Sequence, residues 1–304
     1  MVVYRNVHEL VGKTPLVELT AFSLPEGVRL FAKCEYFNPG GSVKDRLGEK
    51  FVDSALESGK LKPGGTLIEP TAGNTGIGIA LAAVGKNLRV IFCVPEKFSA
   101  EKQTLMRALG AEVVHTPTEK GMAGAVAKAK ELAKQIPGSY VPNQFANSEN
   151  PEAYFETLGP EIWEDLNGQI DILVAGAGTG GTFTGTASFL KSKNPAVKTV
   201  VVEPVGSILN GGEAQAHRTE GIGMEFIPSF VKTQYFDKVY SIADEDAFRR
   251  LKEAAVKEGL LIGSSSGAAL HAALSEASEA GPGTNIVVLF PDSSERYLSE
   301  KIYD

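Results

Sequence analysis

One stretch decides the fold class of this chain: residues 171–182 read Asp171-Ile172-Leu173-Val174-Ala175-Gly176-Ala177-Gly178-Thr179-Gly180-Gly181-Thr182. The first five residues form a short apolar run, which predicts a buried strand. The glycine-rich turn after it is typical of a strand that enters a helix N-terminus. A buried strand that leads into a helix in this way indicates an α/β protein with parallel strands.

The same alternation of apolar runs and helical segments recurs along the chain. Further strands are expected at residues 28–33, 66–69, 89–94, 112–115, 199–203 and 285–290. Helices are expected at residues 99–109, 122–135, 151–166 and 245–258. Because the strands are continuously apolar, we expect them to be buried on both faces, within parallel βαβ units.

The 304 residues are enough for two lobes. The stretch from Pro142 to Pro151 is polar and rich in turn formers, which indicates a crossing between lobes. We therefore expect a smaller lobe of residues 36–147. Residues 1–35 and 148–304 would form a larger, cofactor-binding lobe.

Composition narrows the functional classes. A net charge of −7 argues against a protein whose main task is to neutralise nucleic acid or an anionic membrane. The two cysteines, Cys34 and Cys93, form no CxxC pair and fit a reducing compartment. No two of the four histidines have a zinc-site spacing, so we expect no metal. The N-terminus lacks the apolar run of a signal peptide, and we expect a cytoplasmic protein.

Four glycine-rich turns are candidates for chemistry, and the first, residues 38–46, contains Lys44. Ser42 followed three residues later by Asp45 is a helix-start signature, which predicts that Lys44 lies in the first turn. The positive end of the helix dipole repels a lysine there. Lys44 is therefore either a surface residue or a lysine held partly unprotonated, ready to form a Schiff base.

The second and third turns indicate anion sites. Residues 69–76 lead from a strand into a helix, where backbone N–H groups bind carboxylate or phosphate; a plain turn capped by Asn74 is the alternative. Residues 176–181 match GxGxxG, with Glu203 at the end of the next strand, so a dinucleotide site is a second interpretation. The threonines of this turn suit a terminal phosphate better than a bridging pyrophosphate. Pro204 follows Glu203 in a loop, so a contact of Glu203 with a ribose is unsupported. We favour a phosphate cup.

The fourth turn, residues 263–267, matches GxSxG. No histidine follows Asp292, so the order of a hydrolase triad cannot be completed. A serine-rich helix cap and a polar contact to a ligand remain open. Together the four turns permit a cofactor with a phosphate, an aldehyde and a ring, which describes pyridoxal phosphate.

The motif around Lys44, Asn38-Pro39-Gly40-Gly41-Ser42-Val43-Lys44-Asp45-Arg46, resembles that of the cysteine synthase and cystathionine β-synthase family. These are fold-type II pyridoxal-phosphate enzymes, and the resemblance covers nearly the whole chain. It is greatest to short bacterial, O-acetylserine-dependent members. It implies a two-lobed α/β fold similar to the β-subunit of tryptophan synthase. Two mostly parallel sheets would hold the cofactor between the lobes.

The resemblance also implies roles for single residues. Lys44 would carry the cofactor and act as the base at the substrate α-carbon. Asn74 would hydrogen-bond the cofactor's phenolic oxygen, and Ser265 would face the pyridine nitrogen. The phosphate would be held by Gly178, Thr179, Gly180, Gly181 and Thr182. The substrate carboxylate would be clamped by Thr71, Ala72, Gly73, Asn74 and Thr75, closed by Gln144.

The implied reaction is β-replacement on an amino acid. A neutral serine at the ring nitrogen makes the cofactor a weaker electron sink, which favours prompt loss of the β-substituent. The family commonly has serine where Ala72 stands, so one hydroxyl is missing from the carboxylate clamp. We therefore expect an activated donor, O-acetylserine, to be used more readily than serine.

The acceptor is expected to be homocysteine, giving L-cystathionine, and also sulfide, giving L-cysteine. Residues 220–228 resemble cystathionine β-synthases, with an acidic residue at Glu225 beside Gly223. A carboxylate there would pair with the ammonium of a second amino acid; a solvated loop glutamate is the alternative. Other functions remain open at this point: a plain O-acetylserine sulfhydrylase, a serine or threonine dehydratase and a nicotinamide (NAD) dehydrogenase.

The resemblance further suggests a homodimer. It also suggests that the C-terminus of serine acetyltransferase is a binding partner. The length fits a bare catalytic core, with too little chain before residues 12–15 for a haem-binding extension and none after Asp304 for a regulatory tail. The resemblance implies pyridoxal 5'-phosphate as the cofactor, and the short segment before residues 12–15 leads us to expect no haem.

Overall fold

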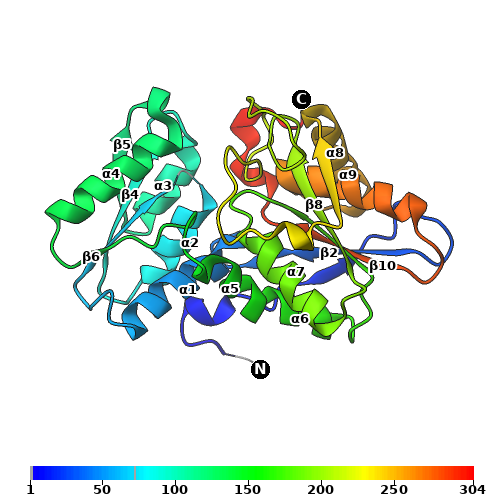
Figure 1. Ribbon diagram of the computed structural model, residues 1–304, viewed down its shortest axis with the longest axis horizontal. Coiled ribbons are helices and arrows are strands. Elements are labelled where there is room, and N and C mark those ends of the chain that lie inside the picture. Colours follow the sequence, from blue (N-terminus) through cyan, green and yellow to red (C-terminus); the bar gives the residue numbers. More distant parts are fainter. Residues whose placement is uncertain (1–2, 72) are drawn as a thin grey trace. The chain divides into compact units, whose positions relative to one another are not determined.

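The computed structural model describes residues 3–71 and 73–304, which divide into two compact units (Figure 1). The smaller unit comprises residues 3–11 and Lys44–Asn150. The larger unit comprises Gly12–Val43 and Pro151–Asp304. Each unit is built around its own sheet.

The smaller unit contains a four-stranded parallel sheet in the order β5-β4-β3-β6. Its strands are β3 (Thr66–Pro70), β4 (Arg89–Pro95), β5 (Glu112–Thr116) and β6 (Ser139–Tyr140). Its helices are α1 (Lys44–Glu57), α2 (Asn74–Ala83), α3 (Ala100–Ala108) and α4 (Gly121–Gln135), with the short 3-10 helices η1 (Val7–Leu10) and η3 (Thr118–Lys120). Helix α5 (Glu149–Glu156) spans the point where the chain passes to the larger unit.

The larger unit contains a six-stranded sheet in the order β1-β2-β10-β7-β8-β9. Its strands are β1 (Leu16–Glu18), β2 (Arg29–Cys34), β7 (Ile172–Gly176), β8 (Lys198–Pro204), β9 (Lys238–Ile242) and β10 (Asn285–Phe290). All neighbouring pairs are parallel except β1 with β2. The helices are α6 (Leu158–Asp165), α7 (Gly181–Lys193), α8 (Asp244–Glu258) and α9 (Ser264–Glu279), with η2 (Glu35–Phe37), η4 (Thr233–Tyr235), η5 (Ser294–Arg296) and η6 (Leu298–Glu300).

The expected α/β class with two mostly parallel sheets is confirmed, and each predicted strand lies within one residue of an observed one. Strands β3, β7 and β10 are almost entirely buried, as continuous apolar runs predict. One helix expected at 151–166 is two helices, α5 and α6, interrupted at Thr157. Pro160 has no N–H to continue α5, so it falls in the first turn of a new helix.

The boundaries of the units differ from the expected ones at three places. Residues 3–11 group with the smaller unit, because the His8 ring lies within hydrogen-bonding distance of a Glu49 carboxylate oxygen, 3.2 Å, and of the Val84 carbonyl, 3.1 Å. Residues 36–43 group with the larger unit, where the Val43 N–H donates to the Pro291 carbonyl at 2.9 Å. The crossing expected near residue 148 occurs after Asn150.

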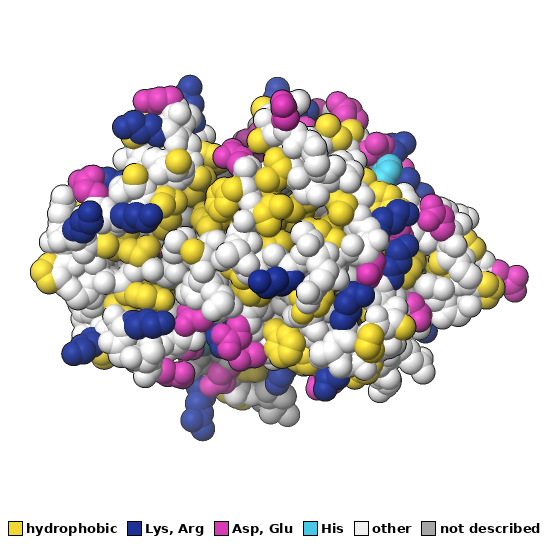
Figure 2. Space-filling view, viewed as in Figure 1, with side chains coloured by type: hydrophobic (Ala, Val, Ile, Leu, Met, Phe, Trp, Pro, Cys, Tyr) yellow, Lys and Arg dark blue, Asp and Glu magenta, His cyan; other side chains and the backbone are white. Residues whose placement is uncertain are grey.

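Charges of both signs are interspersed on the face seen in Figure 2. None of the helices in the described parts of the chain is long and apolar enough to cross a membrane.

Two glycines let helices α1 and α2 pack closely. A Cβ added at Gly78 would collide with the backbone carbonyl of Lys44, and one added at Gly48 would collide with the carbonyl of Gly78. Because no side chain separates the helices there, the start of α1 lies against the body of α2.

We expect Gly78→Ala to lower the free energy of unfolding by about 1–3 kcal/mol, because the new methyl group overpacks the contact with Lys44. Urea denaturation followed by circular dichroism measures this loss. Gly281→Ala is the control, because a Cβ there meets no atom within 4 Å. Equal stability of the two variants would contradict the close contact.

Candidate active site

Lys44 is the first residue of α1, so the prediction that it lies in the first turn is confirmed. Asp45 follows it in that turn and is buried, whereas Lys44 is half-buried. Through Gly78, the backbone of Lys44 lies against α2, the helix that continues the second glycine-rich turn. The smaller unit thus brings Lys44 and that turn together.

The second turn leads from β3 into α2, which begins at Asn74 after Gly73. Thr71 and Thr75 are buried within it, and Asn74 is half-buried. Ala72 lies outside the described residues. Because the first N–H groups of a helix have no partner inside it, the start of α2 can bind a carboxylate.

Gln144 lies against this turn although it is far away in the sequence. Thr75 Oγ1 donates a hydrogen bond to Gln144 Oε1 at 2.8 Å, and Gln144 Nε2 donates to the Pro70 carbonyl at 3.4 Å. Gln144 is 4% exposed. The amide is therefore fixed against the turn from both of its ends.

A buried carboxylate holds the backbone of Gln144. Glu69 accepts hydrogen bonds from the N–H groups of Asn143, at 2.7 Å, and Gln144, at 2.9 Å. Burial raises the pKa of Glu69 to about 7, although the two N–H donors act to lower it.

In the larger unit, strand β7 ends at Gly176 and the third turn leads into α7, which begins at Gly181. Gly180 has φ +81°, a left-handed conformation that favours glycine. A Cβ added at Gly178 would collide with the carbonyl oxygen of Gly221. Thr179 and Thr182 are buried in this turn. Bare backbone at a helix N-terminus, with hydroxyls beside it, suits a phosphate.

The segment of residues 220–225 packs against this phosphate turn. The N–H of Gly223 donates to the Ala177 carbonyl at 2.9 Å, and the N–H of Met224 donates to Ser207 Oγ at 2.9 Å. Glu225, the expected acceptor contact, is exposed beyond the buried Met224.

Ser265 lies in the first turn of α9 and is 3% exposed. The N–H of Glu220 donates to the neighbouring Ser264 Oγ at 3.0 Å. A Cβ added at Gly221 would lie 3.8 Å from Ser265 Oγ. The serine turn, the phosphate turn and the segment of residues 220–225 therefore meet within the larger unit.

Sequence reasoning missed two carboxylates that organise these segments. The sequence pattern shows Glu69 only as the first residue of the second turn, and Glu203 only as the acidic residue that follows the GxGxxG match. Glu203 instead accepts from the backbone N–H groups of Leu209, at 2.8 Å, and Asn210, at 3.0 Å. One signal could have found them, since each is a glutamate followed by proline at the end of an apolar strand.

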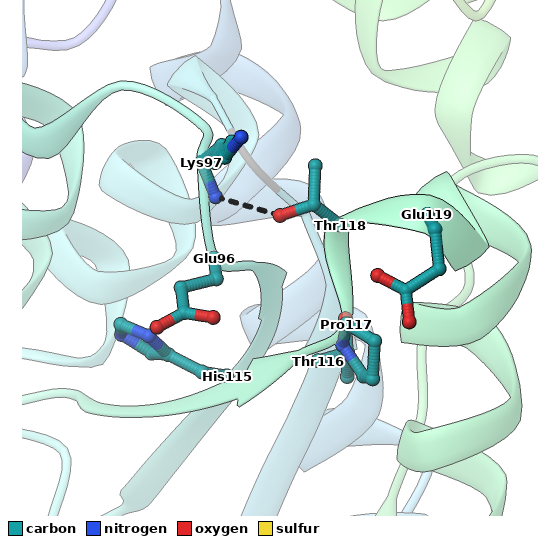
Figure 3. Close-up of a pocket in the computed structure, with 7 residues that line it drawn as sticks. All are labelled: Glu96, Lys97, His115, Thr116, Pro117, Thr118 and Glu119. Atoms are coloured by element: carbon teal, nitrogen blue, oxygen red, sulfur yellow. Dashed lines mark hydrogen bonds between the residues drawn. The ribbon is translucent and has the colours of Figure 1, made fainter.

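A hollow of about 710 Å³ lies in the smaller unit, where β4 and β5 end (Figure 3). It is lined by Glu96, Lys97, His115, Thr116, Pro117, Thr118 and Glu119. The Lys97 N–H donates to Thr118 Oγ1 across it at 3.3 Å. None of the expected site residues lines this hollow, so it contributes nothing to the site. Within residues 3–71 and 73–304, no cluster of His, Cys, Asp and Glu suits a metal ion.

The sequence matches the family model described as "Pyridoxal-phosphate dependent enzyme" over residues 7–292. The chain belongs to this family. This pyridoxal-phosphate dependent enzyme is 62% identical to "O-acetylserine dependent cystathionine beta-synthase" of Bacillus subtilis, over 100% of the chain and 99% of the relative. It is 50% identical to "Cysteine synthase" of Helicobacter pylori, over 100% of both.

Among solved structures, the enzyme resembles an O-acetylserine dependent cystathionine β-synthase from Helicobacter pylori, with a TM-score of 0.96 and 50% identity over 100% of both chains. The resemblance to cysteine synthases and cystathionine β-synthases is thereby confirmed, as is the pyridoxal-phosphate cofactor. Family membership favours the phosphate cup over the dinucleotide interpretation of residues 176–181.

The described residues fit pyridoxal phosphate. The third turn offers bare backbone at Gly178 and Gly180, a helix start and two buried threonines for the phosphate group. The buried Ser265 hydroxyl, which lies near Gly221, can hydrogen-bond a ring nitrogen. Lys44 supplies an amine at the start of α1.

We expect Gly178→Ala to weaken cofactor binding tenfold or more, because the methyl group and the Gly221 carbonyl cannot both keep their places. Equilibrium dialysis against pyridoxal phosphate, followed by visible absorbance, measures the dissociation constant. Gly281→Ala provides the control for a glycine with open space around it. An unchanged dissociation constant in a folded Gly178→Ala protein would show that this turn does not hold the cofactor.

Proposed function

We propose that this enzyme catalyses β-replacement on O-acetylserine, with homocysteine as the main acceptor and L-cystathionine as the product. Its identity of 62% with a relative named an O-acetylserine dependent cystathionine β-synthase, over the full chain, carries this proposal. Sulfide is a second acceptor, giving L-cysteine.

Lys44 would hold the cofactor through its amino group until the amino group of the substrate displaces it, and the freed amine of Lys44 is then the base at the substrate. Pyridoxal phosphate supplies, when bound, an electron sink that makes the proton on the substrate α-carbon acidic. Lys44 Nζ takes that proton, acetate leaves the β-carbon, and the thiol adds there. Lys44 Nζ then returns the proton to the α-carbon.

The N–H groups at the start of α2 bind the substrate carboxylate, together with Thr71, Ala72, Gly73, Asn74 and Thr75. Gln144 supports this clamp through Thr75, whose hydroxyl donates to the amide oxygen. Asn74 also orients the phenolic oxygen of the cofactor. Because Ala72 has no hydroxyl, the backbone N–H groups contribute more of the carboxylate binding. Acetate is a better leaving group than the hydroxyl of serine, and this compensates for the weaker clamp when O-acetylserine is the donor.

Ser265 would face the ring nitrogen with a neutral hydroxyl, which would leave the ring a modest electron sink and favour departure of acetate. Residues 178–182 would hold the phosphate group.

Glu225 and Gly223 select the acceptor. The exposed carboxylate of Glu225 can pair with the ammonium of homocysteine, which sulfide lacks. A hydrogen bond between charged groups contributes about 1.5–3 kcal/mol, enough for a preference of about tenfold or more.

A plain cysteine synthase is the second candidate function. It is favoured by the relative at 50% identity that is named cysteine synthase. The homodimer, the cytoplasmic location, the use of free serine and the binding of a serine acetyltransferase C-terminus stay predictions.

The function is tested by incubating the purified holoenzyme with O-acetylserine or serine, crossed with homocysteine or sulfide, and identifying products by mass. We expect cystathionine from O-acetylserine and homocysteine as the fastest reaction. Cysteine formed from sulfide without any cystathionine would select the second candidate.

We expect Glu225→Ala to lower kcat/KM for homocysteine about tenfold and to leave kcat/KM for sulfide within twofold, because only homocysteine carries an ammonium. Steady-state kinetics with each acceptor measure the two values. Glu213→Ala, which removes another exposed glutamate of the larger unit, is the matched control. Equal losses with both acceptors would contradict the role of Glu225.

A further inference from the structure

Two strands, one in each unit, end in the same way. Strand β3 closes with Glu69-Pro70 and strand β8 closes with Glu203-Pro204. Both glutamates are 0% exposed. Each carboxylate accepts hydrogen bonds from two consecutive backbone N–H groups of a loop that follows later in the chain.

The Glu69 carboxylate fixes the turn at Asn143 and Gln144. One oxygen accepts from each N–H, at 2.7 and 2.9 Å. Asn143 has φ +60°, a conformation that residues other than glycine seldom adopt. The carboxylate therefore holds the backbone where the Gln144 side chain can reach Thr75 and Pro70.

The Glu203 carboxylate fixes the turn at Leu209 and Asn210. One oxygen accepts from the Leu209 N–H at 2.8 Å, and the other from the Asn210 N–H, at 3.0 Å, and from Ser241 Oγ, at 2.9 Å. Ser207, just before this turn, accepts from the N–H of Met224.

Pro204 lies close to Gly223, in the segment of residues 220–225 that would bind the acceptor. A Cβ added at Gly223 would lie 3.1 Å from Pro204 Cγ, and Gly223 has φ +104°. The end of β8 therefore supports the segment of residues 220–225 directly at Pro204 and, through Ser207, at Met224.

We propose that Glu69 and Glu203 are positioning residues with separate tasks, Glu69 for binding of the amino-acid donor and Glu203 for binding of the thiol acceptor. This inference rests on the proposed function, because the donor and acceptor segments are defined there. Neither glutamate contacts a reacting atom; each acts through the loop that its carboxylate holds.

The carboxylate is the group this task needs. Both of its oxygens accept hydrogen bonds, so it satisfies two N–H donors at once. An amide in the same place keeps one acceptor and turns an NH2 donor toward the second N–H group. Glutamine therefore preserves the size of the side chain and removes one anchor point.

The role of Glu69 implies that binding of the donor depends on pH. Its titratable neighbours across the sheet are Cys93 on β4 and Tyr140 on β6, with Lys128 and Glu131 of α4 near Cys93. Burial raises the pKa of Cys93 to about 11 and also raises that of Tyr140, so neither titrates near neutrality. Burial raises the pKa of Glu69 to about 7, so the carboxyl loses its proton as pH rises through that value, and both of its oxygens then accept from the two N–H groups.

The test compares the wild-type, Glu69→Gln and Glu203→Gln holoenzymes, each variant serving as the matched control of the other. In a reaction with two half-reactions, kcat/KM for each substrate reports its own half. We expect Glu69→Gln to lower kcat/KM for O-acetylserine tenfold or more and to leave that for the thiol within twofold. Glu203→Gln should do the reverse.

Two further measurements distinguish a positioning role from a general loss of structure. Cofactor absorbance should be the same in all three proteins. The ratio of donor kcat/KM between wild type and Glu69→Gln should grow as pH rises through about 7 and stay constant for Glu203→Gln. Where Glu69→Gln does not fold, Glu69→Asp replaces it, and where Glu203→Gln does not fold, Ser241→Ala replaces it. Each weakens the hydrogen bonds of the same carboxylate and should lower kcat/KM for the same substrate. Loss of both kcat/KM values to the same extent, or of neither, overturns the inference.

Failure of the proposed function is a different result. A wild-type enzyme that makes no cystathionine refutes the acceptor assignment, and the same comparison then runs with sulfide as the thiol. The donor arm can also be followed without any acceptor, by the absorbance change when O-acetylserine is added.

Discussion

The close approach of helices α1 and α2 is the constraint on which the smaller unit depends. Gly48 and Gly78 bring the two backbones together, so that the carbonyl of Lys44 lies where a side chain on residue 78 would otherwise stand. The backbone at the start of α1, where Lys44 stands, is thereby held against the body of α2, the helix that follows the second glycine-rich turn. Chemistry that needs groups from both segments needs such a fixed arrangement of their backbones.

Backbone groups, placed by glycines and by buried carboxylates, do most of the anion binding in this account. The chain carries a net charge of −7, so its overall field does not attract anionic ligands. Glycines at 178 and 180 keep the phosphate turn bare, while Glu69 and Glu203 fix the turns that support the two substrate segments. A carboxylate is a suitable anchor because it accepts several N–H bonds, and burial keeps water from competing.

Much of the fold could be predicted from the sequence, because its buried parallel strands are continuous apolar runs. The strand at 285–290 was predicted at its observed bounds, and Lys44 was placed in the first turn of α1 from Ser42 and Asp45 alone. Strand β6, of two residues, and the half-buried edge strand β9 have no such signal. The break at Thr157 depends on one proline, Pro160, within an otherwise helical pattern.

The site was predictable only where its residues are close in sequence. Each glycine-rich turn is a local pattern, whereas the bond between Glu69 and Gln144 spans 75 residues and leaves no spacing to detect. Glu203 lies only six and seven residues before its backbone partners Leu209 and Asn210, but these belong to a loop without periodicity. Residues 220–225 were assigned by resemblance alone. In the structure this segment contacts the third glycine-rich turn at Ala177 and Gly178.

The central claim is that Lys44 holds the cofactor, and borohydride reduction tests it most directly. Reduction fixes the cofactor to the amine that carries it, and digestion with mass spectrometry then locates it. The account predicts the added mass on the peptide that contains Lys44. The same mass on a peptide with another lysine, such as the buried Lys33, would contradict it.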